Sequence, residues 1–400
     1  MVARVHYPKF SDGEYARRWR KIREAMEARQ LDCLLIYGAY GSAFGTDPGQ
    51  ANLRYVSNFA DQLHAYCVFP RRGEPTLLTS FLGHLTTGRE VSAVPDMRFG
   101  GLRIGDKVVE LLREREMDRA RIGIVGAHAG RGISIPHDHY LALTASLPSA
   151  EFEVVTELFD ELRRIKSDEE IAFLRKGAAI TDRAFEAQLK ATKPGARNID
   201  LYNAILFETH RAGGMLCFAL LGSTPMANPN MSFPDPYISD RAIGKGDVIV
   251  NEHSSCYGGY SGQILRTVFV GSPTKQYERL FEIGIEVFRR VKVAMKPGAT
   301  TADVQRAAEP IVNANLTVTA PLLHGWANFL EPPIMGIKGS RIPIAEWTFQ
   351  RGETIVIEPN PCTPDLKSGI FLGDLCVVTE NGAESLHTYP IDRPIVVEGF

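Results

Sequence analysis

The chain has 400 residues, and its 45 lysines and arginines nearly balance its 47 aspartates and glutamates, for a formal net charge of −2. This balance gives no electrostatic reason to expect nucleic acid as a partner. A hydrophobic content of 44% and a charged content of 23% are ordinary for a globular protein, and the length suits two domains.

The sequence predicts neither a secretion signal nor a membrane-spanning segment. The six cysteines are scattered without a CxxC pair, which fits reduced thiols better than a disulfide framework. The N-terminal residues lack the apolar core of a secretion signal, and no apolar run approaches the length of a membrane span. We therefore expect a cytoplasmic protein with no membrane contact.

The first part of the chain alternates helical and strand patterns. Ser11 and Glu14 have the spacing of a capping box, and apolar residues then recur at helical spacing as far as Met26. Short apolar runs typical of buried strands follow at 33–37, 65–69, 76–79 and 122–125, with a helical stretch at 106–115. This alternation predicts an α/β domain with a mixed sheet over residues 1–160.

The second part begins with a long helix and then changes to strands. A capping box at Ser167 and Glu170 precedes an amphipathic stripe that runs to Phe185. Runs at 247–253 and 263–270 flank a glycine turn and predict a hairpin, and two more strands are expected at 354–358 and 372–379. These elements form a predicted second domain over residues 161–400.

Four segments of the second domain carry a resemblance to a known family. They are GDVIVNEHSSCYGGYSGQILRTVFVG (246–271), LLHGWANFLEPP (322–333), ETIVIEPN (353–360) and FLGDLCVVTENG (371–382). In order and spacing they resemble the signature strands of the pita-bread superfamily of creatinase, prolidase and methionine aminopeptidase. ANLRYVSNF (51–59) resembles an element of the creatinase and Xaa-Pro peptidase branch. The resemblance implies a creatinase-type N-terminal α/β domain and a C-terminal pita-bread domain, an α/β fold in the mixed α+β sense.

The resemblance also locates the metal-ligand positions of the superfamily. Metallo-members bind two ions through Asp, Asp, His, Glu and Glu, whereas this chain has Glu252, Gln263, His324, Glu358 and Gly373 at those positions. A neutral amide and a glycine replace two carboxylates. We therefore expect no metal ligands in the working site and no cofactor.

The remaining polar residues at these positions are the candidate catalytic groups. Alternation places Glu252 on the same strand face as two valines, and a buried glutamate is costly unless it is paired or functional. The alternative is a solvent-facing carboxylate or one paired with Arg266. Glu358 follows an apolar strand and is interpreted in the same way. His324 is either a core histidine or a general acid/base, and Gln263 can orient a substrate amide or carbonyl.

Substrate-binding candidates lie around this group. Asp235 and Glu331 stand where the resemblance places substrate-binding histidines of the peptidases, which predicts that the peptide-cleaving apparatus is absent. Asp374 is a further candidate. In the creatinase branch the N-terminal domain of a partner subunit closes the site, which implies a homodimer with Tyr55 and His64 at the lid.

Together these residues predict a metal-independent hydrolase that cleaves a C–N bond, amide or amidine, of a small polar molecule. Glu252 would be the nucleophile or base, His324 would shuttle protons, and Glu358 would bind a cationic or N–H-bearing group. Three alternatives stay open: a metal-dependent Xaa-Pro aminopeptidase or prolidase-like peptidase, a lyase or decarboxylase, and a catalytically inactive binding module on the same fold.

Overall fold

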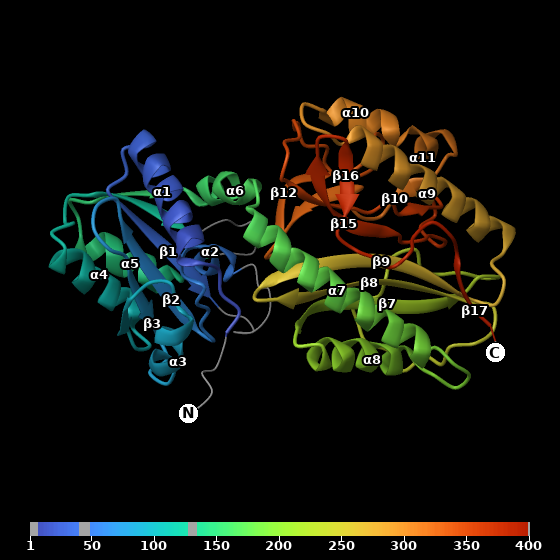
Figure 1. Ribbon diagram of the computed structural model, residues 1–400, viewed down its shortest axis with the longest axis horizontal. Helices are drawn as coiled ribbons and strands as arrows, with labels where there is room; N and C mark the ends of the chain where they lie inside the picture. The colour runs from blue at the N-terminus through green and yellow to red at the C-terminus, as the bar shows by residue number, and fades with distance from the viewer. Residues whose placement is uncertain (1–6, 40–48, 127–133, 399–400) are drawn as a thin grey trace. The chain divides into compact units, whose positions relative to one another are not determined.

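The computed structural model describes residues 7–39, 49–126 and 134–398, and the chain divides into two compact units (Figure 1). Unit 1 is Met1–Arg163 and unit 2 is Arg164–Phe400, so the division falls close to the sequence-based boundary at 160/161. Within the described ranges, no helix has both the length and the apolar character needed to cross a bilayer.

Unit 1 is built on a six-stranded sheet with the order β4-β3-β2-β1-β5-β6. Its elements are α1 (Asp12–Ala28), β1 (Cys33–Ala39), α2 (Ala51–Ser57), β2 (His64–Pro70), β3 (Thr76–Thr79), α3 (His84–Val91), β4 (Asp96–Phe99), α4 (Ile104–Glu114), β5 (Arg121–Val125), α5 (His137–Ser146), β6 (Glu151–Val154) and α6 (Thr156–Arg164). β1 is antiparallel to β2 and parallel to β5, which makes the sheet mixed as the sequence predicts. Both faces are buried, because Leu34 and Ile36 enter one hydrophobic core and Leu35 and Tyr37 enter another.

The capping box predicted at the start of α1 forms only in part. The Ser11 hydroxyl accepts the backbone N–H of Glu14 at 3.2 Å, as a capping residue does. The Glu14 carboxylate does not complete the box. It accepts hydrogen bonds from Arg17 and Arg18 instead.

Unit 2 contains a nine-stranded sheet whose main order is β12-β11-β13-β15-β9-β8-β7, with β16 paired to β15 and β17 paired to β9. Its helices are α7 (Asp168–Ala191), α8 (Asn198–Arg211), α9 (Lys275–Ala294), α10 (Thr301–Ala307) and α11 (Glu309–Asn313). Its strands are β7 (Met215–Pro225), β8 (Asp247–Tyr257), β9 (Tyr260–Val270), β10 (Thr317–Val318), β11 (Leu323–Trp326), β12 (Leu330–Met335), β13 (Thr354–Ile357), β14 (Pro361–Cys362), β15 (Gly373–Thr379), β16 (Gly382–Ser385) and β17 (Ile395–Val397). Both halves of the predicted capping box form at Ser167 and Glu170.

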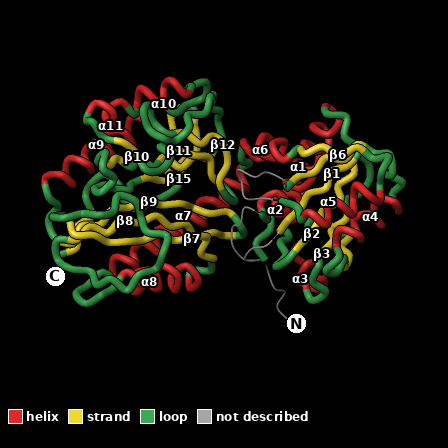
Figure 2. Tube along the Cα trace, turned by 180° about the vertical axis from the view of Figure 1, so that it is seen from behind, coloured by secondary structure: helices red, strands yellow, loops and turns green. Residues whose placement is uncertain are grey.

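One face of the β8–β9 hairpin is covered by α7, which lies along both strands in the two opposite views (Figures 1 and 2). The approach is close. A Cβ added at Gly262 would lie 2.3 Å from the Cα of Ala178. The Thr181 hydroxyl of α7 donates to the Gly262 carbonyl at 2.7 Å and accepts the Ser255 N–H at 3.0 Å. Side chains that alternate away from α7 therefore share the other face of the hairpin.

The register of the hairpin decides which residues those are. Glu252 pairs with Leu265, and Ser254 pairs with Gln263, so all four side chains point to the face opposite α7. We call this the site face.

Candidate active site

Four polar side chains meet on the site face of the sheet, and all four were singled out from the sequence. The Gln263 amide nitrogen donates to Glu252 Oε1 at 2.6 Å and lies 3.5 Å from Glu358 Oε2. The same nitrogen lies 3.4 Å from His324 Nε2, which is 3.5 Å from Glu358 Oε1. The structure therefore brings Glu252, Gln263, His324 and Glu358 into one group, which we call the central group.

The local sequence explains why these side chains converge. Glu252 and Gln263 come from neighbouring strands β8 and β9, His324 from β11, and Glu358 from the position directly after β13. The backbone N–H of Glu358 donates to Leu322 O at 2.8 Å, which continues the β11–β13 pairing to that position. Each functional residue thus lies on a strand or at its end, where hydrogen bonds to neighbouring strands fix its backbone.

Burial and mutual charge control the ionisation of the central group. Burial raises the pKa of Glu252 well above its usual value, and the negative charge of Glu358 raises it further. Burial also raises the pKa of Glu358, although His324 beside it acts in the opposite direction. For His324, burial lowers the pKa, but the charge and hydrogen bond of Glu358 outweigh burial and leave the pKa raised. All three shifts are upward, so each group holds its proton to a higher pH than it would in water.

An apolar wall borders the central group on one side. Trp326 stacks edge-on against His324 at 5.6 Å between ring centroids, and Phe218 lies 5.9 Å from Trp326 in the same manner. Phe329 is 5.6 Å from Trp326. Phe218 pairs with Ser254 across β7 and β8, so it belongs to the site face, and both phenylalanines are half-buried. A ligand at the central group would thus have aromatic surface beside it.

Glu331 and Asp374, two predicted substrate-binding residues, already have buried cationic partners. Glu331 on β12 forms an ion pair with Lys166, and both side chains are buried. Asp374 on β15 accepts from Arg266 at 2.8 Å and from the Ser385 hydroxyl at 2.7 Å. Asp374 also alternates to the face opposite Gly373, away from the central group. Both carboxylates therefore take part in buried ion pairs within unit 2. Their role in substrate binding stays a prediction.

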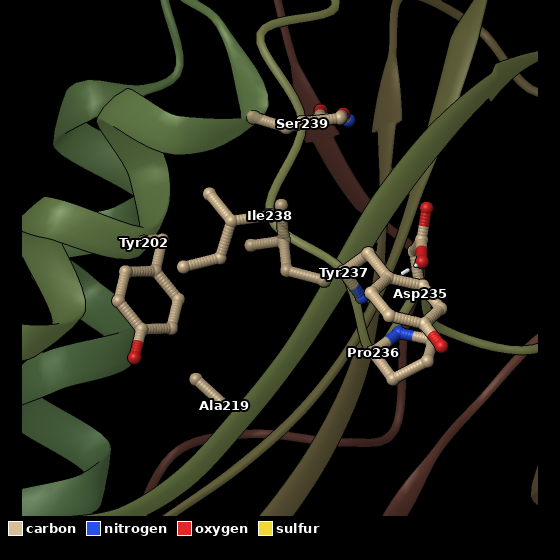
Figure 3. Close-up of a pocket in the computed structure, with 9 residues that line it drawn as sticks. Tyr202, Ala219, Asp235, Pro236, Tyr237, Ile238 and Ser239 are labelled. Carbon is tan, nitrogen blue, oxygen red and sulfur yellow. Dashed lines mark hydrogen bonds between the residues drawn. The ribbon is translucent and has the colours of Figure 1, made fainter.

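Asp235 lies in the segment between β7 and β8 and packs against Gly222 of β7. A Cβ added at Gly222 would lie 3.0 Å from the Asp235 Cβ. Figure 3 shows Asp235 at the start of the loop that lines a hollow opposite Tyr202 of α8, with its carboxylate accepting the Tyr237 N–H at 2.9 Å. The hollow has a volume of about 10 Å³, the space of one water molecule at most. It is too small to be a substrate site.

The two predicted lid residues belong to unit 1. Tyr55 is 1% exposed and donates its hydroxyl to Leu162 O at 3.2 Å, with its ring against Phe159. His64 is less buried and shares a hydrogen bond of 2.7 Å with the Tyr37 hydroxyl. Tyr55 is therefore a core residue of unit 1. The lid role of Tyr55 and His64 stays a prediction.

Sequence reasoning missed Ser254 and His387. Ser254 lies on the site face two residues after Glu252 and directly opposite Gln263, and its buried hydroxyl has no hydrogen-bond partner within the described part of the chain. Alternation from Glu252 could have found it. His387 donates to the Gln263 carbonyl at 2.8 Å from the other face of the sheet. His387 lies just after β16 and belongs to no motif. It is 124 residues from Gln263 along the chain, so local spacing could not have linked the two.

Two protein-family models match consecutive parts of this chain. Residues 18–165 match the creatinase/prolidase N-terminal domain, and residues 172–380 match metallopeptidase family M24. The architecture is similar to the Xaa-Pro dipeptidase of Bacillus anthracis, with a TM-score of 0.78 and 21% identity over 96% of this chain and 100% of that one. A prolidase of Thermococcus sibiricus gives a TM-score of 0.80 and 19% identity over 98% and 100%.

The family follows from the extent of the match. Because residues 172–380 are more than half of the chain, the protein belongs to metallopeptidase family M24, within the creatinase/prolidase superfamily of hydrolases. An uncharacterized hydrolase/peptidase of Sinorhizobium fredii is 26% identical over 97% of this chain and 98% of its own length. The Xaa-Pro dipeptidase of Pyrococcus furiosus is 27% identical over 59% and 66%. The predicted resemblance and the predicted two-domain α/β fold are confirmed.

The predicted reaction is not confirmed. A metal-independent hydrolase acting on a small polar molecule is contradicted, because the matching family is one of metallopeptidases and named relatives are Xaa-Pro dipeptidases. These findings support the peptidase alternative. The error came from treating the replaced metal-ligand positions as evidence for a different substrate, although substrate class and metal chemistry depend on different residues.

The family name implies metal ions, and the described residues do not fit the two-ion centre. At the fourth carboxylate position, a Cβ on Gly373 would lie 2.3 Å from Ile357 O and 2.8 Å from the Glu358 Cα, so backbone fills that space. The Gln263 amide lies between the other donors and carries no negative charge. In the described ranges, no three His, Cys, Asp or Glu side chains are arranged to hold a metal.

Proposed function

We propose that the chain hydrolyses short peptides and that a dipeptide ending in proline is its substrate class. The observation that carries the proposal is the central group itself: a buried imidazole, two carboxylates and an amide converge at the signature positions of a peptidase fold. Relatives that share this domain and are named Xaa-Pro dipeptidases supply the substrate class.

The leaving group of an Xaa-Pro bond explains the use of His324. The proline nitrogen carries no hydrogen in the peptide, and it must gain a proton when the bond breaks. His324 carries a proton that Glu358 stabilises at 3.5 Å, and it lies at the edge of the apolar wall. In the proposal, a water molecule adds to the carbonyl carbon and gives a proton to Glu358, while His324 donates its proton to the proline nitrogen as the C–N bond breaks. Return of the proton from Glu358 to His324 restores both groups.

Glu252 and Gln263 act on the carbonyl side in this proposal. Gln263 holds Glu252 Oε1 at 2.6 Å, which leaves the other carboxyl oxygen to carry the proton. A carboxyl group kept neutral by its surroundings can donate a hydrogen bond to a carbonyl on which negative charge develops. The ring of a proline or an apolar side chain of the first residue would lie against Phe218 and Phe329.

The test is a panel of dipeptides that differ only in the second residue, such as Ala-Pro, Ala-Ala and Ala-Gly. The purified protein would be assayed with a chelator and, separately, after addition of Mn²⁺, Co²⁺ or Zn²⁺, and its bound metal would be measured by elemental analysis. Release of free proline from Ala-Pro, faster than hydrolysis of Ala-Ala, is the expected result. The proposal fails if no dipeptide is cleaved in any of these conditions.

We further propose that the protein is a cytoplasmic homodimer, with Tyr55 and His64 in the domain that closes the partner's site. The support is the resemblance to the creatinase branch. Sedimentation would show a dimer, and a monomer at assay concentrations that still turns over peptide would overturn this arrangement.

A further inference from the structure

A buried acid–base pair lies directly behind the central group, on the face of the sheet toward α7. His387 Nδ1 lies 2.7 Å from Asp182 Oδ1, and the side chains of His387 and Asp182 are 0% and 6% exposed. The other ring nitrogen of His387, Nε2, lies 2.8 Å from the backbone carbonyl of Gln263. The pair therefore contacts the residue whose side chain joins the central group on the opposite face.

Contacts at both ring nitrogens of His387, and at both carboxylate oxygens of Asp182, hold this pair in place. A carbonyl oxygen can only accept, so His387 Nε2 carries a hydrogen. Asp182 Oδ2 accepts from the Thr388 N–H at 2.7 Å, the Thr388 hydroxyl at 3.0 Å and the Tyr389 N–H at 3.2 Å. Burial would raise the pKa of Asp182, but His387 and Thr388 outweigh burial and lower it. Both ring nitrogens of His387 thus face oxygen atoms, Asp182 Oδ1 at one end and the Gln263 carbonyl at the other, which holds the ring in one orientation.

The place of this contact in the sheet explains what it does. β15 pairs with β9 only at Gly373↔Leu265 and Asp374↔Ile264, so the strand pairing stops next to Gln263. The segment after β16 enters there, because the Leu386 N–H donates to Leu375 O at 2.9 Å. His387 thus supplies a hydrogen bond to the Gln263 carbonyl at the position where the neighbouring strand no longer pairs with β9.

We infer that Asp182 and His387 form a positioning pair that fixes the backbone of Gln263, and through it the amide that lies among Glu252, Glu358 and His324. The inference concerns the same site as the proposed function and rests on it only for the effect on catalysis. The Gln263 amide nitrogen is held by Glu252 at 2.6 Å, and Oε1 has no hydrogen-bond partner among the described residues, so a shift of the strand backbone would move the amide among its neighbours. Its orientation therefore depends on the strand backbone that His387 holds.

The experiment compares His387→Leu and His387→Gln by two readouts. Protein labelled with ¹⁵N-glutamine gives the side-chain NH₂ signals of Gln263, assigned by their loss in Gln263→Leu. In His387→Leu these signals shift or broaden, and kcat for the proline dipeptide falls about 10- to 100-fold with little change in KM. His387→Gln keeps one N–H donor, so its kcat and signals lie between those of His387→Leu and the wild type.

A buried histidine of unit 1 supplies the control. His139 is 5% exposed and bonds the Tyr66 hydroxyl, so His139→Leu removes a similar buried contact far along the chain from the site. It should lower the melting temperature while leaving the Gln263 signals in place. Unchanged Gln263 signals in both His387 variants would overturn the positioning role. Altered signals in a protein without peptidase activity would support the positioning role and refute the proposed function.

Discussion

The two faces of the β8–β9 hairpin both bury ionisable groups, but they differ in how the carboxyl groups are paired. On the face toward α7, Arg266 pairs with Asp374 at 2.8 Å, and His387 pairs with Asp182 at 2.7 Å. Each of these carboxylates also accepts further hydrogen bonds. Each of these buried carboxylates thus has a basic side chain of its own.

The site face leaves its groups incompletely matched. Glu252 and Glu358 are both buried near a single imidazole, and the Ser254 hydroxyl has no partner within the described ranges. A buried polar group without a partner costs about 1–3 kcal/mol. The α7 face therefore gives each buried carboxylate its own basic partner, whereas the site face gathers two carboxyl groups around one imidazole. Four substitutions test this difference between the two faces.

The largest effect is expected from His324→Gln on the site face. The substitution keeps a polar side chain but removes the proton donor, so kcat for a proline dipeptide should fall about 10²- to 10⁴-fold. Stability should fall as well, because Glu358 loses the imidazole that lies beside it. Steady-state kinetics and urea unfolding of the same preparation measure both quantities. A kcat near that of the wild type would remove His324 from catalysis.

Arg266→Leu tests the opposite face. The substitution leaves the buried Asp374 without its cation, and the expected loss of unfolding free energy is about 3–5 kcal/mol. Arg290→Leu is the matched control, because Arg290 pairs with Glu286 at the surface with 51% and 45% side-chain exposure. That control should lose less than about 1 kcal/mol. Equal losses in the two variants would show that burial does not distinguish these pairs.

Glu252→Gln should have the reverse effect on stability, and the effect should depend on pH. The folded state raises the pKa of Glu252, so it binds more protons than the unfolded state above the unfolded carboxyl value of about 4.3. Wild-type stability therefore falls as pH rises from about 4.3 through the folded pKa, and the variant lacks this loss. The variant should gain on the order of 1 kcal/mol relative to wild type between about pH 5 and pH 8.

Urea unfolding at several pH values would measure that gain, with exposed Glu346→Gln as the control. Glu346→Gln should track the wild type at every pH. A stability difference between Glu252→Gln and wild type that stays constant with pH would contradict the raised pKa of Glu252.

The smallest effect is expected from Phe218→Ala in the apolar wall. Loss of one aromatic contact is worth about 0.5–1.5 kcal/mol, so KM for the proline dipeptide should rise about 2- to 10-fold with kcat nearly unchanged. Phe207→Ala is a suitable control because Phe207 is 69% exposed on α8. Equal KM values for the two variants would place the substrate elsewhere on the sheet.

The sequence by itself determined the parts of this protein that depend on local pattern. The capping box at Ser167, the glycine turn of the hairpin and the alternation of β8 and β9 predicted elements that the structure confirms. Because alternation fixes which face a side chain takes, it also placed Glu252 and Gln263 together once the hairpin register was known. The four ordered motifs predicted the superfamily for the same reason.

Only the tertiary structure decided which polar groups have partners. Glu331 has the same residue type as Glu358, yet it meets Lys166 at a distance of 165 residues along the chain. His387 meets Asp182 across 205 residues, and neither residue lies in a motif. Such pairings arise from how α7 and the segment after β16 pack on the sheet. Long-range packing, which no local spacing encodes, therefore separates the residues of the central group from the charges that stabilise the fold.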